Sequence, residues 1–243
     1  MSSSLPAYFV YAGTELEGMA EARNYYAWLL SYFGRHLKGS VIEVGAGVGT
    51  LSRLILGFQA VRQLAAVEPA ENLFPILSQR LGGDRRAKPL KGYLHDIAAE
   101  MRADTLVSVN VLEHVEDDGA FLRAAFQVLS PGGTCLLFVP AVSALYGSLD
   151  RAFDHFRRYG KKELALKLRA AGFAIELLRY FNLPGVLAWF MAGKILRKTS
   201  LRARDTRFYD RWVVPWISVL ERYWEPPIGQ SLLVVARKPV ENV

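Results

Sequence analysis

Residues 41–50 read VIEVGAGVGT, an apolar run that meets an acid, Glu43, and then three glycines at alternate positions. The apolar residues Val41 and Ile42 predict a buried strand. The glycines predict a tight turn, because a residue without a Cβ lets the backbone adopt unusual angles and approach a ligand closely. We therefore expect a strand that leads into a ligand-binding turn at Gly45 and Gly47.

On both sides of this turn, predicted helices alternate with predicted strands. Helices are expected at 17–37, 50–58, 71–81, 117–129 and 161–171, and strands from about residue 40 and at 64–68, 89–94, 104–110, 134–139, 173–180 and 231–237. The stretch SPGG, residues 130–133, is expected to stop the fourth helix. Such alternation predicts an α/β fold with a mainly parallel sheet covered by helices on both faces.

Polar residues recur where the predicted strands end. Glu68, Asp96 and Asn110 each follow a strand, as the glycine turn does. Ligands of such sheets bind at the carboxyl ends of the strands, close to the point where the strand order reverses. These positions are therefore expected to share one site. We expect a single domain, divided into an N-terminal helical segment (1–39), a core (40–181), a helical insertion (182–227) and a last strand with a tail (228–243).

The composition narrows the class of protein. About half of the 243 residues are hydrophobic, which supports a large core. A single cysteine, Cys135, excludes a disulfide framework and argues against a structural zinc site. The first ten residues, MSSSLPAYFV, lack the basic region and long apolar core of a signal peptide, so we expect a cytoplasmic protein.

Charge is distributed unevenly along the chain. Residues 1–150 hold 12 Lys/Arg against 15 Asp/Glu, whereas residues 151–243 hold 18 against 8. The basic second part could attract phosphate, carboxylate, nucleic acid or an anionic membrane, and the alternative is a solvated basic face.

The glycine spacing distinguishes between two nucleotide cofactors. A dinucleotide site has the pattern G-x-G-x-x-G and an acid about 20 residues further on, which grips ribose hydroxyls. The chain has G-A-G-V-G, and Glu68 supplies the acid. Glu43 at the mouth of the turn would repel a pyrophosphate but attract a cation. A nucleoside with an ammonium and a sulfonium group therefore fits better than one with phosphates.

Five stretches in order, VIEVGAGVGT, VEPAENL, LHDI, VNVLEHVEDD and LSPGGTCLLFVP, resemble the motifs of class I S-adenosylmethionine-dependent methyltransferases over residues 40–180. The resemblance implies a Rossmann-like, mostly parallel sheet of seven strands and S-adenosylmethionine as cofactor. It implies cofactor contacts from Glu43, Gly45, Ala46, Gly47, Glu68, Pro69, Asp96, Ile97, Asn110, Val111 and Leu112.

The resemblance also gives several of these residues a role. Glu43 is expected to face the amino group, Glu68 to accept hydrogen bonds from the ribose hydroxyls, and Asn110 to contact the methionine portion. Asp96 and the Ile97 N–H are expected to bind adenine. The alternatives are a helix cap for Asp96 and helix packing for Gly49, while Glu113 and His114 could simply stabilise a turn.

Two absences bear on the acceptor of the methyl group. No NPPY-like or DPPY-like tetrapeptide follows the fourth strand, where methyltransferases of exocyclic nucleic-acid amines carry one. Cys135 lies in an apolar strand and is expected to be a core residue rather than the nucleophile of cytosine methylation. We therefore expect a small, partly apolar or lipid-like acceptor and no nucleic acid.

Residues 140–164, PAVSALYGSLDRAFDHFRRYGKKEL, follow the fifth strand, where class I enzymes usually contact the acceptor. They resemble bacterial small-molecule methyltransferases with an H-x-R-R-Y segment. His155 is expected to take the acceptor proton, and Arg157 or Arg158 to clamp an anionic group. Tyr146 and Tyr159 complete the expected contacts, and no metal is expected. In the alternative, His155 orders the loop against Asp150 or Asp154, and one arginine pairs with an acid.

The insertion begins with LPGVLAWFMAGKIL, residues 183–196, which is too short to span a bilayer. It predicts a lid over the acceptor that includes Trp189. The alternatives are a dimer surface, ordinary packing, or a membrane contact flanked by Lys194, Arg197, Lys198, Arg202 and Arg204.

These observations favour methyl transfer from S-adenosylmethionine to a small, partly apolar or anionic acceptor by in-line displacement. One alternative is a nicotinamide-dependent oxidoreductase. The other is a basic module that binds nucleic acid or membranes without catalysis.

Overall fold

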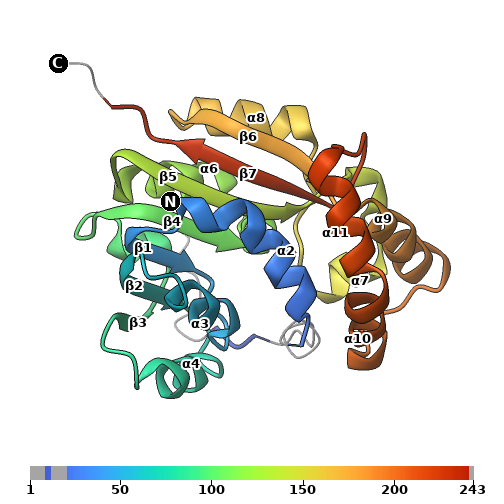
Figure 1. Ribbon diagram of the computed structural model, residues 1–243, viewed down its shortest axis with the longest axis horizontal. Coiled ribbons are helices and arrows are strands. Elements are labelled where there is room, and N and C mark those ends of the chain that lie inside the picture. The colour runs from blue at the N-terminus through green and yellow to red at the C-terminus, as the bar shows by residue number, and fades with distance from the viewer. Residues whose placement is uncertain (1–8, 12–20, 241–243) are drawn as a thin grey trace.

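The computed structural model describes residues 9–11 and 21–240. In this part of the chain, seven strands form one sheet in the order β3-β2-β1-β4-β5-β7-β6 (Figure 1). The strands are β1 Gly39–Val44, β2 Val61–Glu68, β3 Ala87–Lys91, β4 Ala103–Val109, β5 Leu129–Pro140, β6 Ala174–Phe181 and β7 Ser231–Arg237. Only β7 runs antiparallel to its neighbours within this sheet, which confirms the predicted mostly parallel, Rossmann-like sheet.

Helices cover both faces of the sheet (Figure 1). Buried side chains of α2 Arg23–Phe33, α3 Thr50–Leu56, α4 Phe74–Leu81 and α11 Val214–Tyr223 join one apolar cluster, and those of α5 Leu94–Ile97, α6 Asp118–Val128 and α8 Lys161–Ala170 join the other. Within β1, Val41 faces the first cluster and Ile42 the second. This alternation follows from the two-residue period of a strand that is buried on both faces.

The strand order reverses at β1, which pairs with β2 on one side and β4 on the other. The chain therefore leaves the carboxyl ends of β1 and β4 in different directions and opens a crevice between them. The glycine turn after β1 and Asn110 after β4 both lie at this crevice.

Some predicted boundaries differ from the structure. The first helix changes to a 3₁₀ turn, Gly34–His36, and its expected beginning at 17–20 lies outside the described residues. The third strand ends at Lys91, and the chain enters α5 at Leu94, where a strand was predicted. Residues 130–133 belong to β5 rather than to a loop. The strand extends because the Gly132 N–H donates to the Lys238 carbonyl and the Lys238 N–H donates to that of Gly133.

Four helical segments lie between β6 and β7: α9 Leu183–Phe190, a π-helical turn Met191–Ile195, α10 Ala203–Trp212 and α11. Two buried acids hold α10 and α11 in place. Asp210 accepts hydrogen bonds from the Asn24 and Tyr25 N–H groups at the start of α2. Glu221 accepts from the N–H groups of Asn182 and Leu183 at the start of α9. Among the described residues, no helix has both the length and the apolar character needed to cross a membrane.

Short helices connect the remaining elements. A 3₁₀ turn, Leu112–His114, follows β4, and a second, Ser143–Leu145, together with α7 Ser148–Ala152, follows β5. These two connections carry several polar residues of the crevice, among them Asn110, Glu113, His114 and His155, so loops that the sheet positions form part of the site.

Candidate functional site

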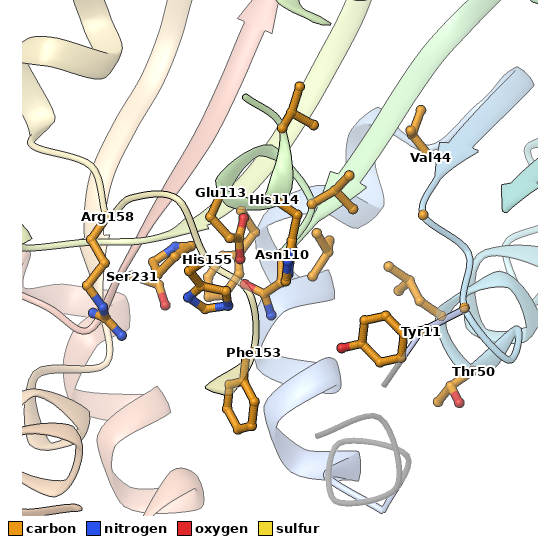
Figure 2. A pocket seen from close by; sticks show the side chains of 18 of the residues that line it. Tyr11, Val44, Thr50, Asn110, Glu113, His114, Phe153, His155, Arg158 and Ser231 are labelled. Atoms are coloured by element: carbon orange, nitrogen blue, oxygen red, sulfur yellow. The ribbon is translucent and has the colours of Figure 1, made fainter. Parts of the chain in front are cut away.

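A cavity of about 1300 Å³ occupies the crevice. Its wall includes Gly45 of the first turn, Glu68 at the end of β2, Asn110 after β4, His155 after β5 and Trp189 of α9. Segments that are far apart in the sequence thus share one site at the carboxyl ends of the strands (Figure 2). Of the residues predicted to bind the cofactor, Glu43, Gly45, Ala46, Gly47, Glu68, Pro69, Asn110 and Val111 line the cavity.

The turn after β1 requires glycine. Gly45 and Gly47 have φ angles of 71° and 56°, in the left-handed region. A Cβ on Gly45 would lie 2.4 Å from Cγ2 of Val111, which packs directly against the turn. Gly49 is also left-handed, and a Cβ there would meet Leu77 at 3.0 Å, consistent with the helix-packing alternative.

Two buried acids lie beside this turn. The Glu68 carboxylate accepts hydrogen bonds from the Gly47 N–H at 2.7 Å and the Ala70 N–H at 2.9 Å. Glu43 accepts one from the Ser52 hydroxyl. Burial and, less strongly, the nearby Glu68 raise the pKa of Glu43 to about 8, against the hydrogen bond from Ser52. Burial also raises the pKa of Glu68. This end of the cavity combines two buried acids with a backbone turn that a ligand can approach closely. It therefore fits a ligand with cationic and hydroxyl groups, such as S-adenosylmethionine.

Substituting Glu43 with glutamine should change how stability depends on pH. Between pH 4.5 and about 8, folded Glu43 keeps its proton while the unfolded chain loses it, so stability falls as pH rises. The loss is at most about 1.4 kcal/mol per pH unit. Urea unfolding of the ligand-free chain at pH 5 and pH 8 should show this slope in the wild type and a shallower slope in Glu43→Gln. Equal slopes would contradict a buried, protonated Glu43.

The two predicted adenine contacts, Asp96 and Ile97, have other partners in the structure. Asp96 accepts a hydrogen bond from the Tyr93 N–H at 2.7 Å and so caps α5, which was the alternative. Ile97 packs against the apolar core. Neither Asp96 nor Ile97 lines the cavity, because both residues belong to α5, which begins soon after β3 ends. The wall there includes Tyr93 and His95, whose rings stack 5.5 Å apart and which the sequence analysis missed.

After β4 the chain turns sharply at Asn110, which has a φ of 53°. Its N–H donates to the Phe138 carbonyl at 2.8 Å, and both Asn110 and Val111 line the cavity. Leu112, predicted to contact the cofactor, is fully buried in the core instead. The apolar side chain turns inward because the 3₁₀ turn begins at this residue.

Asp150 is the centre of a polar cluster on the other side of the cavity. Its buried carboxylate accepts hydrogen bonds from Arg158 Nε at 2.6 Å, Trp189 Nε1 at 3.1 Å and the Gly147 N–H at 2.9 Å. His155 Nδ1 lies 3.0 Å from the same carboxylate. Burial alone would raise the pKa of Asp150, but the hydrogen bond from His155 and the charge of Arg158 lower it to about 2.

An ionised Asp150 determines which nitrogen of His155 carries a proton. A carboxylate only accepts hydrogen bonds, so Nδ1 is the donor and Nε2 of the neutral ring remains as a base. His155 lines the cavity (Figure 2). The structure thus supports the alternative in which His155 orders the loop against Asp150, and its role as a proton acceptor stays a prediction.

Glu113 and His114 extend this cluster, and Figure 2 shows both beside His155. The His114 and His155 rings are perpendicular, with centroids 4.7 Å apart. Burial lowers the pKa of His114 to about 4, so this ring is neutral at pH 7. One potential ligand atom from each of the three residues lies within 4.8 Å of the others, a set of residue types that could hold a metal ion. The sequence analysis predicted no metal and missed this group.

Of the five predicted acceptor contacts, Arg158 and Trp189 line the cavity. Arg158 is not a free clamp, however. Its side chain is buried, Nε binds Asp150, Nη1 donates to the Ala141 carbonyl at 2.7 Å, and the guanidinium lies 4.7 Å from the centre of a Trp189 ring. The alternative in which one arginine pairs with an acid is therefore correct for Arg158.

The other three predicted contacts have structural partners and do not line the cavity. Arg157 forms an ion pair with Asp118 at 3.0 Å. Tyr159 is fully buried and donates its hydroxyl to the Leu112 carbonyl and to Asp118. The Tyr146 hydroxyl donates to the His155 carbonyl at 2.7 Å, so Tyr146 holds the loop rather than a ligand.

Comparison with known proteins agrees with this geometry. Residues 16–178 match a family model described as a methyltransferase domain. The ubiquinone biosynthesis O-methyltransferase of Xanthomonas euvesicatoria is 32% identical over 156 residues, which cover 56% of this chain and 63% of the relative. The chain thus matches less than two thirds of the length of this curated relative.

Solved structures show the same fold at low sequence identity. An S-adenosylmethionine-dependent methyltransferase of Mesorhizobium loti has a TM-score of 0.57 at 17% identity, over 83% of this chain and 92% of that one. Phosphoethanolamine N-methyltransferase 2 of Haemonchus contortus, solved with S-adenosyl-L-methionine, has a TM-score of 0.60 at 19% identity, over 89% of this chain and 52% of that one.

Proposed function

The chain belongs to the class I methyltransferase family, and from this premise we propose that it transfers a methyl group from S-adenosylmethionine to a hydroxyl group of a small, partly apolar acceptor. One observation carries the proposal. A single cavity has the glycine turn with two buried acids on one side and the Asp150–His155 pair on the other.

On the cofactor side, Glu43 and Glu68 supply hydrogen-bonding oxygens, and the turn supplies close backbone contact. S-adenosylmethionine supplies a methyl group on a sulfonium, which is reactive enough that no covalent intermediate with the protein is needed. The protein's task is then to align the acceptor with that methyl group, an effect worth up to about 7–11 kcal/mol in favourable cases.

On the acceptor side, His155 Nε2 accepts the hydroxyl proton, and Asp150 stabilises the resulting imidazolium through Nδ1–H. Phe153, Trp189 and Met191 give this part of the wall its apolar character. A hydroxyl acceptor is supported by the proton-accepting pair and by the name of the curated relative, an O-methyltransferase.

The two alternatives have less support. A nicotinamide cofactor would place a pyrophosphate near Glu43 and Glu68, and the family match is to methyltransferases. A basic binding module would not need a proton acceptor oriented into a cavity of this size. The cytoplasmic location and the division of the chain into segments stay predictions.

The proposal is tested with methyl-labelled S-adenosylmethionine and an organic-solvent extract of bacterial cells. We expect labelled product that depends on the chain and survives mild alkali, because methyl ethers resist hydrolysis whereas methyl esters do not. Reaction with a boiled chain gives the background. Label found on nitrogen or carbon would contradict the hydroxyl acceptor, and label only in esters would place the methyl group on a carboxylate.

A further inference from the structure

The helices α10 and α11 carry a row of exposed apolar side chains, which we call the aromatic stripe. Within each helix most of its members lie three or four residues apart, so they share one side of that helix. Trp216 and Tyr223 are 80% and 83% exposed, which is unusual for residues of this size. The stripe consists of Phe208, Trp212, Trp216, Val219, Leu220 and Tyr223.

The packing of these helices does not require the stripe. Asp210, Val214, Ile217 and Glu221 are buried on the opposite side, where they attach the helices to α2, α9 and the sheet. In Figure 1, α10 and α11 lie at one end of the molecule, beyond the sheet. As far as residues 9–11 and 21–240 show, the stripe is therefore free to contact another molecule.

Positive charge is concentrated in the insertion that carries the stripe. Residues 183–227 contain eight Lys/Arg against four Asp/Glu, and two of those acids, Asp210 and Glu221, are buried against backbone N–H groups. The Arg211 guanidinium lies 5.5 Å from the centre of the Trp212 ring. The basic residues are all exposed: Lys194, Arg197, Lys198, Arg202, Arg204, Arg207, Arg211 and Arg222.

This combination of aromatic and basic residues favours a membrane over a second copy of the chain as the partner of the stripe. In a two-fold dimer built on the stripe, the arginines of both copies would face each other, and like charges repel. An anionic lipid surface instead attracts the arginines, and tryptophan and tyrosine favour the boundary between headgroups and acyl chains. We propose that the aromatic stripe docks this protein on an anionic lipid bilayer.

The same insertion links the bilayer to the cavity. Trp189, Met191, Leu196 and Tyr209 line the cavity, and the exposed Ile195 and Leu196 continue the apolar surface outward. Docking would thus bring the cavity wall next to an apolar acceptor dissolved in the membrane. This last step rests on the proposed function, whereas the docking itself does not.

Vesicle co-sedimentation tests the docking without cofactor or acceptor. We expect the full chain to sediment with vesicles of phosphatidylglycerol and phosphatidylcholine, to bind pure phosphatidylcholine much less, and to be released as salt is raised. The double variant Trp216→Ser/Tyr223→Ser should bind at least tenfold less. Leu166→Ser is the matched control, because Leu166 is 66% exposed on α8, away from the insertion.

Charge is tested in the same assay. Arg211→Glu/Arg222→Glu should lose binding to anionic vesicles, while Arg169→Glu on α8 should not. Docking is overturned if the wild type ignores phosphatidylglycerol vesicles, or if the stripe variant binds as well as the wild type. A dimer in light scattering that Trp216→Ser/Tyr223→Ser dissociates, without vesicle binding, would assign the stripe to a second copy. Vesicle binding without any methyl transfer would leave the docking intact and count against the proposed function.

Discussion

Replacing His155 with asparagine is expected to lower kcat by about 10²–10⁴-fold, the usual contribution of a positioned general base. Asparagine keeps a polar side chain of similar reach but cannot accept the hydroxyl proton at neutral pH. Affinity for S-adenosylmethionine should stay within about threefold, because the proposed cofactor contacts lie on the other side of the cavity. Single-turnover kinetics with labelled cofactor, together with calorimetry for binding, separate the two quantities.

The neighbouring histidine provides the control. His114→Asn should lower kcat much less, since burial holds the pKa of His114 at about 4 and the ring is a poor proton acceptor. If the two variants lose activity equally and a chelator inhibits the wild type, Glu113, His114 and His155 act as metal ligands and the proton-acceptor role is wrong. If the His155→Asn variant turned over at the wild-type rate, the proton-acceptor role of His155 would also be contradicted.

Replacing Asp150 with alanine should destabilise the fold by about 3–5 kcal/mol, the cost of breaking a buried ion pair by removing one partner. The Arg158 guanidinium, whose side chain is fully buried, would lose its carboxylate, and Trp189 Nε1 would lose its acceptor. Urea unfolding at pH 7 measures the change.

Two further variants show whether the ion pair is the cause. Asp154→Asn, in the same loop but exposed, should change stability by less than about 0.5 kcal/mol. Arg158→Met in the Asp150→Ala background should restore part of the loss, because it removes the unpaired buried charge. A change below about 1 kcal/mol for Asp150→Ala would mean that the cluster is not a stabilising centre.

The sheet could be predicted because its determinants are local. Apolar runs such as Val41–Ile42 and the glycines that follow fix a strand and a turn within ten residues. The predicted order of strands and helices is therefore confirmed, and the errors lie at boundaries where distant backbone decides. Residues 130–133 extend β5 only because Lys238, more than a hundred residues later, pairs with them.

The acceptor side was harder to predict because its contacts are long-range. Arg157, Arg158 and Tyr159 are consecutive, yet one pairs with Asp118, one with Asp150 and one with the core. The H-x-R-R-Y pattern alone does not show which of these three partners each side chain contacts. Asp150 itself was named only as a partner for His155, and its bond to Trp189 joins residues 39 apart in the sequence.

The insertion shows the same limit. Its helices could be expected from their apolar residues, but the burial of Asp210 and Glu221 and the exposure of Trp216 reverse the usual preference of these residue types. The acids are buried because they cap other helices. Within the part of the chain that the structure describes, packing does not account for the exposure of Trp216, and this exposure therefore supports an external partner.

Titration calorimetry of the wild-type chain with S-adenosylmethionine, with NAD as the comparison, tests the central claim most directly. We expect saturable binding of one S-adenosylmethionine per chain and no heat from NAD, with affinity at least tenfold lower in Glu68→Ala, which removes a buried acceptor on the cofactor side. Binding of NAD without binding of S-adenosylmethionine would contradict the account, and unchanged affinity in Glu68→Ala would show that this carboxylate does not hold the cofactor.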